Sequence, residues 1–337
     1  MPDHPRKQES LGRNPIFTWD EGLTSSGESE ALSINATDLA EPATAAPPPK
    51  AVEAPQSAVA AAPSERLTVL EPGRTERNYW RDLWQYRELF AILAWRDVSV
   101  RYKQTVIGVA WALIRPFLTT VVFTIVFGQL AKLPSEGEAP YPVMVFAGLI
   151  PWFLFAGVLG DASSSLLGNA HLISKVYFPR LVIPIAAAVV ALVDFAINFV
   201  MLALIMGWYG FMPGWQVVFL PVFVLLAILA SLGPALWITS LNVKYRDFRF
   251  IVPFIIQLGL YVSPVGFASS VVPEEWRLLY SLNPMVGVID GFRWCLLGGH
   301  SPLYWPGFLM SLGVVAFFLW FGVRYFRATE RTFADMV

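Results

Sequence analysis

The sequence predicts an all-α membrane protein with six transmembrane helices, an amino-terminal interfacial amphipathic helix, and a re-entrant helical hairpin between the fifth and sixth transmembrane helices. Three observations lead to this fold class. The 337 residues are 55% hydrophobic and 15% charged, with a mean hydropathy of +0.54, whereas soluble domains carry about a quarter charged residues. Apolar runs long enough to cross a bilayer recur along the chain. Positive charges collect in alternate connections between these runs.

The first 70 residues differ in composition from the rest. They contain the stretch EPATAAPPPKAVEAPQSAVAAAPSE, which is rich in Ala, Pro, Ser and Glu. Such a segment offers too little apolar surface to offset the entropy of ordering the chain. It lacks a positively charged head followed by an apolar core, so it is not expected to be a signal peptide. Residues 1–70 are therefore expected to be a disordered cytoplasmic tail.

Residues 71–105 are expected to hold the interfacial helix and the entry to the membrane. A helix that lies on the cytoplasmic leaflet has apolar residues at helical spacing and charges between them. The alternative is an ordinary helix packed beneath the membrane domain. The interfacial position is favoured because the segment leads directly into an apolar run. The apolar positions within Trp80–Val98 are Leu83, Tyr86, Phe90, Leu93 and Val98.

Residues 106–337 are expected to form the six-span domain. A bilayer core about 30 Å thick needs roughly 20 apolar residues of helix. Prolines occur inside several of the runs, and membrane helices tolerate them because neighbouring groups satisfy the freed carbonyls. The expected spans are Ile107–Leu130, Val143–Leu167, Leu181–Trp208, Val217–Leu241, Phe250–Phe267 and Pro306–Phe326.

The distribution of lysine and arginine predicts the orientation. These residues are concentrated before the first span, between the second and third, between the fourth and fifth, and after the sixth. Cytoplasmic connections carry such an excess, so both termini are predicted to be cytoplasmic. Arg96, Arg101 and Lys103 are predicted to anchor the inner end of the first span at the anionic leaflet, at about 1 kcal/mol each.

The connection 268–305 is long and contains two apolar pieces, Glu274–Ser281 and Met285–Leu297, separated by Asn283 and Pro284. Each piece is too short to cross a bilayer. Helices of this kind are re-entrant or interfacial, and they need protein or a wet cavity to cover exposed backbone. We predict a helical hairpin on the outer side.

Enzymatic and metal chemistry are not expected in this chain. There is no GxxxxGK[ST] phosphate loop, no Gly-x-Ser-x-Gly elbow and no HExxH. Cys295 is the single cysteine, and His4, His171 and His300 lack ligand spacing. No acid/base cluster has catalytic spacing.

Three carboxylates lie in the apolar region. Asp194 and Asn198 are four residues apart and share a helix face. Asp161 stands near the cytoplasmic end of the second span, and Asp290 lies in the hairpin. Asp161 and Asp194 could line a transport path, but interhelical hydrogen bonding and packing are favoured for them.

A series of motifs then resembles one family. In order they are RDVSVRYKQTVIGVAWALIRPFL, AGLIPWFLF, NAHLISKVYFPR, LNVKYRDFRFIVPF, LNPMVGVIDGFRW and RYFRATERTFADMV. Each is weak alone, but six in this order around six spans closely resemble the membrane subunit of bacterial ABC exporters for polysaccharides. That family includes O-antigen, capsule and teichoic-acid permeases. The resemblance covers about Leu67–Val337 and does not extend to the tail.

The resemblance implies a homodimer in the bacterial inner membrane with two copies of a separate ATP-binding cassette subunit, which would hold ATP and Mg. It also implies that the segment Asn169–Arg180 contacts this ATPase. The alternative for Lys175, Tyr177 and Arg180 is anchoring at the membrane interface. The coupling residues expected are Asn169, Leu172, Lys175, Tyr177, Phe178, Pro179 and Arg180.

The substrate implied is a long glycan on an undecaprenyl-type lipid. Aromatic rings offer flat apolar faces on which sugars can slide. The path residues expected are Arg115, Trp111, Trp152, Phe153, Phe155 and Tyr261. The hairpin would act as an outer gate through Trp276, Asn283, Pro284, Asp290 and Arg293.

Arg115 lies about 12 Å into the first span and precedes Pro116, where a bend near the inner mouth is expected. Arg115 would either snorkel to the interface or face the path and meet pyrophosphate or acidic sugar. Three other classes of protein remain as alternatives: an ABC permease for a lipid or drug, a membrane-embedded transferase, and a structural scaffold.

Overall fold

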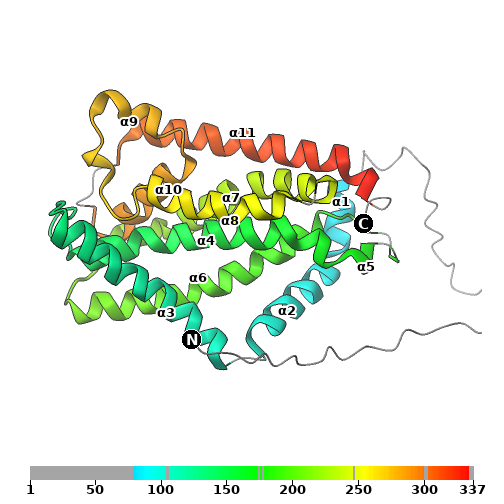
Figure 1. Cartoon of the computed structure of the whole chain (residues 1–337), viewed down its shortest axis with the longest axis horizontal. Coiled ribbons are helices and arrows are strands. Elements are labelled where there is room, and N and C mark those ends of the chain that lie inside the picture. The colour runs from blue at the N-terminus through cyan, green and yellow to red at the C-terminus, as the bar shows by residue number, and fades with distance from the viewer. Residues whose placement is uncertain are drawn as a thin grey trace, which may run out of the picture. The chain divides into compact units, whose positions relative to one another are not determined.

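The computed structural model describes residues 79–103, 106–173, 175–176, 178–245, 247–299 and 303–333, without the side chains of 106–109 and 331. The predicted tail and the side chain of Tyr177 lie outside the described residues. The described part of the chain is helical and contains no strand. Its elements (Figure 1) are α1 Tyr79–Gln85, α2 Arg87–Lys103, α3 Val106–Phe123, η2 Thr124–Leu130, α4 Tyr141–Gly168, α5 Ala170–Ile173, α6 Val182–Trp208, η3 Trp215–Phe219, α7 Leu220–Lys244, α8 Phe248–Val262, η4 Ser269–Val271, α9 Glu274–Tyr280, α10 Pro284–Leu296, α11 Trp305–Thr329 and η5 Glu330–Thr332.

Five of the six expected spans are confirmed as helices long and apolar enough to cross a membrane. They are Ala110–Leu130, Tyr141–Gly168, Val182–Trp208, Trp215–Lys244 and Trp305–Thr329. The bend expected at Pro116 stays a prediction; the α-helix runs through Pro116 and changes to a π-helix at Thr124.

The predicted helix Phe250–Phe267 is wrong at its carboxyl end. Helix α8 stops at Val262 and has 15 residues, so it is about 22 Å long, shorter than a bilayer core. Ser263 precedes Pro264 and has extended backbone (φ −81°, ψ 152°), because a residue before proline is disfavoured in the helical region. The following segment 263–268 is non-helical and almost entirely buried.

Helix α4 is the centre of the bundle. It packs against α3, α6, α7, α8 and α10, and most of its side chains are buried. Its small residues allow close approach: a Cβ at Gly157 would stand 2.9 Å from the Cβ of Ala191 on α6. Membrane helices associate through small residues of this kind, because lipid provides no hydrophobic force between helices.

The pair α7 and α11 is packed even more closely. A Cβ at Gly322 would stand 2.1 Å from the carbonyl oxygen of Gly233, and a Cβ at Gly233 would stand 2.6 Å from the backbone of Phe318 and Leu319. Backbone therefore lies against backbone, and no larger residue fits either glycine without moving a helix.

A second apolar core joins α1 and α2 to the rest of the chain. Tyr79 and Leu93 pack in it with Phe178, Phe326 and Phe333. The predicted apolar stripe of Leu83, Tyr86, Phe90, Leu93 and Val98 is buried or partly buried, and its members from Leu83 to Leu93 pack on this core. This contact with protein matches the alternative of a packing helix. The large hydrophobic side chains that stay exposed on α1 and α2 are Trp80, Trp84, Ile92, Trp95 and Val100.

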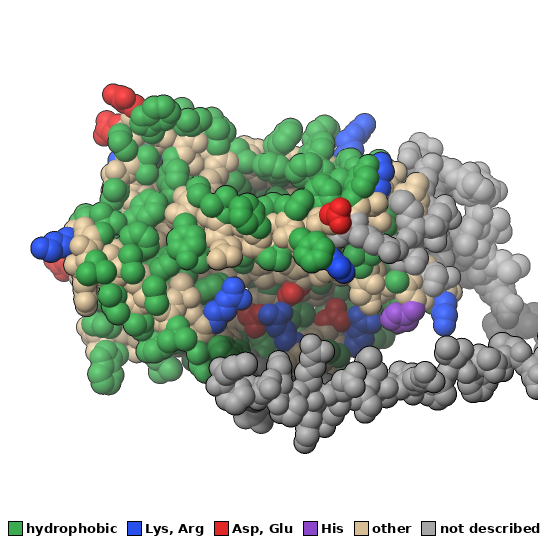
Figure 2. Space-filling view, in the orientation of Figure 1, with side chains coloured by type: hydrophobic (Ala, Val, Ile, Leu, Met, Phe, Trp, Pro, Cys, Tyr) green, Lys and Arg blue, Asp and Glu red, His purple; other side chains and the backbone are tan. Residues whose placement is uncertain are grey.

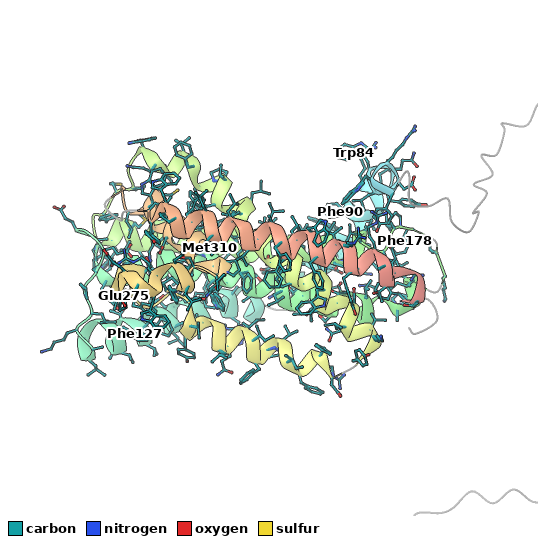
Figure 3. All side chains as sticks on the ribbon, turned by 90° about the horizontal axis from the view of Figure 1, so that it is seen from above. Trp84, Phe90, Phe127, Phe178, Glu275 and Met310 are labelled. Atoms are coloured by element: carbon teal, nitrogen blue, oxygen red, sulfur yellow. The ribbon has the colours of Figure 1, made fainter. Side chains whose placement is uncertain are left out.

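The two ends of the bundle differ in content. Helix α5 lies at one end and α9 at the other (Figure 1); we call them the α5 end and the α9 end. Trp84, Phe90 and Phe178 lie at the α5 end, while Phe127 and Glu275 lie at the α9 end (Figure 3). Between the ends the visible face is mainly apolar, except for charged side chains that gather around α2 (Figure 2). An apolar flank between polar ends is what a membrane protein presents to lipid.

Candidate functional site

The segment between α4 and α6 is exposed in its middle and buried at both ends, which we call its roots. His171, Lys175 and Val176 are exposed, and Leu172 is partly buried. The flanking predicted residues are covered: Asn169 at one end, and Phe178 and Pro179 at the other, are buried. The seven predicted coupling residues therefore divide into an exposed part and two roots, with Tyr177 not described.

The first root is a hydrogen-bonded asparagine. Asn169 caps α4 by donating from Nδ2 to the carbonyl oxygen of Ser165 at 2.8 Å. Its Oδ1 accepts a hydrogen bond from Arg96 Nη2 on α2 at 2.7 Å. Arg96 also pairs with Asp97 at 2.6 Å. The segment is thus tied to α2 where it leaves α4.

The second root is bonded to the carboxyl-terminal turn, which is η5 with Phe333. The backbone N–H of Arg180 donates to Glu330 Oε1 at 2.8 Å, and the Arg180 guanidinium donates to the carbonyl oxygen of Glu330. The same guanidinium lies over the Phe333 ring, 5.9 Å from its centroid. Burial raises the pKa of the Glu330 carboxyl, and the hydrogen bond from Arg180 counteracts the rise.

An ion cluster connects α2 to α4 and α6. Arg101 pairs with Asp161 on α4 at 2.8 Å and with Asp194 on α6 at 3.0 Å, and the Tyr102 hydroxyl donates to Asp194. The structure therefore contains the interhelical bonding favoured for Asp194, and Asp161, for which packing was favoured, is also bonded between helices. Of the three predicted anchors, Arg96 and Arg101 have partners within the protein, and Lys103 is exposed.

The predicted path residues separate into two groups. Arg115 is exposed on α3 and lies over the Phe153 ring of α4, 5.7 Å from its centroid. Trp111 and Tyr261 are also exposed, at 60% and 57%. Trp152 and Phe155 are in tilted ring contact, with centroids 5.3 Å apart, and are buried within the chain.

Helix α8 covers the Trp152 ring of this buried pair. A Cβ at Gly259 would stand 2.5 Å from the Trp152 ring. Because the glycine has no side chain, the ring fits directly against the α8 backbone. Trp152 could reach a substrate only if α8 moved away from α4.

The α9 end is organised by Arg293, which is completely buried. Its Nη1 donates to the carbonyl oxygen of Phe267 and its Nη2 to that of Val265, both at 2.9 Å. Nη1 also pairs with Glu136 at 3.3 Å. The arginine therefore satisfies the irregular backbone after α8, as backbone buried in an apolar setting requires.

The two short helices predicted in this connection are present as α9 and α10, with a break at Asn283 and Pro284, whereas the re-entrant hairpin stays a prediction. Asn283 is the N-cap of α10, since its Oδ1 accepts the Met285 N–H at 3.0 Å, and Pro284 is the first residue of α10, where proline is favoured. Asn283 Nδ2 donates to Ser263 Oγ at 2.9 Å. Trp276 is separate from this cluster and exposed on α9.

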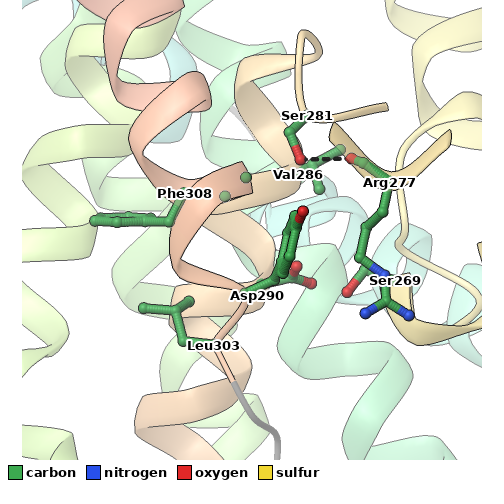
Figure 4. A pocket seen from close by; sticks show the side chains of 10 residues that line it. Ser269, Arg277, Ser281, Val286, Asp290, Leu303 and Phe308 are labelled. Carbon is green, nitrogen blue, oxygen red and sulfur yellow. Dashed lines mark hydrogen bonds between the residues drawn. The ribbon is translucent and has the colours of Figure 1, made fainter. Parts of the chain in front are cut away.

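A small cavity lies between α9, α10 and the start of α11 (Figure 4). Arg277, Asp290 and Phe308 are among its lining residues, and Ser281 Oγ donates to the carbonyl oxygen of Arg277 at 2.8 Å beside it. Asp290 is buried, and among the described residues its Oδ1 has no hydrogen-bond partner. Burial raises the pKa of Asp290 to about 7, and the Arg293 charge limits the rise.

The functional partners that sequence reasoning missed are Tyr79, Glu136 and Glu330. Glu330 stands 150 residues from Arg180, and Glu136 stands 157 residues from Arg293. No periodicity links positions so far apart. The only available signal for Glu330 was its place in the last recurring motif, RYFRATERTFADMV.

Comparison with known proteins decides the family. A family model described as "ABC-2 type transporter" matches residues 88–297, more than half of the chain. The chain belongs to the ABC-2 type transporter family. The matched region of this ABC-2 chain includes both roots of the 169–180 segment up to Arg180, the ion cluster and the hairpin. It excludes Tyr79 and Glu330.

Three relatives of this ABC-2 chain carry descriptive names. The O-antigen export system permease protein RfbA of Myxococcus xanthus is 28% identical over 260 residues, which are 76% of this chain and 98% of the relative. The protein of the same name from Klebsiella pneumoniae is 26% identical, over 74% of this chain and 95% of the relative. The polysialic acid transport protein KpsM of Escherichia coli is 21% identical, over 70% and 91%.

Proposed function

We propose that this chain is the transmembrane subunit of an exporter that moves a lipid-linked polysaccharide, resembling O-antigen, across the bacterial inner membrane. The observation that carries the proposal is the match along 98% of an O-antigen export permease. Two copies of the chain would form the pathway, and two ATP-binding cassette subunits would supply the energy. The chain itself has no phosphate loop, so ATP and Mg would be bound by the partner and not by this subunit.

The proposed topology has both termini in the cytoplasm and six crossings. Five crossings would be made by the long apolar helices. Helix α8 with the buried segment 263–268 would make the other, because irregular backbone is tolerated at membrane depth where protein covers it. The exposed Trp80, Trp84 and Trp95 of α1 and α2 would lie at the inner membrane surface, where tryptophan is favoured.

In the proposed mechanism, the ATPase contacts the segment Asn169–Arg180 through its exposed part around Lys175. The glycan would meet Trp111, Arg115, Phe153 and Tyr261, which are the accessible members of the predicted path. Sugar C–H faces pack on aromatic rings, and a cation at Arg115 could pair with a pyrophosphate or acidic sugar. The hairpin α9–α10 would act as the outer gate.

The deciding experiment is depletion of the chain in its own cell. If the proposal is correct, lipid-linked glycan accumulates on the cytoplasmic side and disappears from the surface, and a plasmid copy of the gene restores export. Absence of the cytoplasmic accumulation would overturn the proposal. Purification in mild detergent is a second test, because the complex should contain an ATP-binding cassette subunit in a ratio of one to one.

A further inference from the structure

The carboxyl-terminal turn holds the start of α6. Helix α6 begins at Val182, and its N-cap residue, Leu181, provides no side-chain hydrogen bond. The N–H groups at the start of a helix have no partner within the helix. Glu330, which follows α11 in sequence, accepts the N–H of Arg180 just ahead of α6. A carboxylate is also favoured at this place by the helix dipole. Glu330 therefore holds the residue just before the N-cap of α6, although the two positions are 150 residues apart in the sequence.

The same turn, η5 with Phe333, makes three further contacts with Arg180 and the second apolar core. The carbonyl oxygen of Glu330 accepts from the Arg180 guanidinium. Phe333 packs on that guanidinium and on Phe326, whose ring centroid is 5.3 Å away. Arg180 is thus held by the turn through both its backbone N–H and its guanidinium.

Helix α1 contributes to the same apolar core. Arg327 of α11 lies 4.7 Å from the ring centroid of Tyr79 on α1. Tyr79 is buried in the core that contains Phe178, Phe326 and Phe333. Residues from α1, the 169–180 segment and the end of α11 therefore pack as one unit, whereas the middle of the segment, at Lys175 and Val176, remains exposed.

We propose that Glu330 is a positioning residue for the coupling segment: it fixes Phe178–Arg180 to the end of α11, so that a push on the exposed part moves α6 and α11. This inference rests on the proposed function. A segment whose far root is loose would absorb the displacement in local motion. The ATPase would then hydrolyse ATP with less glycan exported per turnover.

Three variants isolate the effect. Glu330→Ala removes the acceptor for the Arg180 N–H. Glu330→Gln keeps an acceptor oxygen at the same reach. Thr332→Ala is the matched control, because Thr332 lies in the same turn with an exposed side chain that donates to the Thr329 carbonyl and to no other described residue.

The first measurement is hydrogen exchange of residues 178–183 in the purified full-length chain. Glu330→Ala should raise exchange there about tenfold or more, since a hydrogen bond to a charged group is lost. The exchange rate of Glu330→Gln should stay within about threefold of the wild-type rate. The exchange rate of Thr332→Ala should equal the wild-type rate. Unchanged exchange in Glu330→Ala would overturn the inference without reference to any substrate.

The second measurement is the amount of glycan exported per ATP hydrolysed, normalised to assembled complex. Glu330→Ala should lower this ratio while leaving the amount of complex unchanged, and Glu330→Gln should restore it. A merely structural role would lower the amount of complex and leave the ratio as it is, which would contradict the inference. A wild-type complex that hydrolyses ATP and moves no glycan would overturn the proposed function instead, and the exchange result would then decide the inference by itself.

Discussion

The two ends of this protein use arginine in different ways. At the α9 end, Arg293 is completely buried and bonds two carbonyls and one carboxylate. At the α5 end, Arg180 is partly buried and is gripped by a single turn of chain, beside residues that remain exposed. Both contacts join positions about 150 residues apart along the sequence.

The difference reflects what each arginine holds. The backbone after α8 has no regular structure and almost no access to water, so it needs donors from outside, and one guanidinium supplies them in a fixed geometry. The middle of the 169–180 segment is exposed to water, which satisfies its backbone groups. This segment therefore needs bonds from the rest of the protein only where it joins α4 and α6. The α9 end is therefore built for rigidity, and the α5 end is built to present a surface.

The largest effect is expected from Arg293→Ala. It removes three hydrogen bonds, two to buried carbonyls and one to the Glu136 carboxylate. Breaking a buried ion pair on one side costs about 3–5 kcal/mol. Thermal unfolding of the purified protein in detergent should show a large loss of stability. Arg277→Ala is the control, because the Arg277 side chain makes longer hydrogen bonds, of 3.2 and 3.4 Å, to backbone carbonyls and lies over the Tyr304 ring, 5.5 Å from its centroid, without pairing with a carboxylate in the part of the chain that the structure describes. Similar losses in both variants would contradict the special role of Arg293.

The second prediction concerns pH at the α9 end. Burial raises the pKa of Asp290 to about 7 from 3.8, which corresponds to at most about 4 kcal/mol. The folded protein then binds a proton that the unfolded chain releases, so the stability that Asp290 contributes is fully present below about pH 4 and is lost as the pH rises through 7.

Asp290→Asn should remove this dependence. Between pH 5 and pH 8 the melting temperature should fall more for wild type than for the variant. An equal fall in both proteins would show that Asp290 ionises in the folded state as it does in water.

A smaller effect is expected from Arg101→Ala, which tests how α2 is held near the α5 end. The variant leaves Asp161 and Asp194 without their shared cation. Because the Arg101 and Asp161 side chains are 44% and 37% exposed, the loss should be about 1 kcal/mol. Adding Asp161→Asn and Asp194→Asn should recover most of it in the same unfolding assay. No recovery would mean that Arg101 acts through packing and not through charge.

The smallest effect on stability is expected between the two ends, at Arg115. Arg115→Leu should change stability by less than about 0.5 kcal/mol, as for other exposed sites, and should leave assembly intact. Export should nevertheless slow, because the cation exposed beside Phe153 is lost from the path. An unchanged export rate would assign Arg115 to the snorkelling side chains.

Much of the architecture could be predicted from residue patterns. Apolar runs of fixed length identify five spans, because the bilayer sets the length. Asn283 and Pro284 predict the break between α9 and α10, because a capping residue followed by proline starts a helix. The early end of α8 was missed, although Pro264 carried the signal, because prolines elsewhere in the chain, such as Pro116 and Pro151, remain inside helices.

The sequence by itself determined the helical class, the family resemblance, and the absence of a phosphate loop, since these depend on composition and local spacing. Only the tertiary structure decided which charged groups meet. Arg180 with Glu330, Arg293 with Glu136, and Arg101 with its two aspartates are pairings between distant helices. It also divided the path aromatics into buried and exposed, because helix packing determines which face is covered. Local patterns carry helix length and phase, whereas partners across the bundle depend on how the whole chain packs.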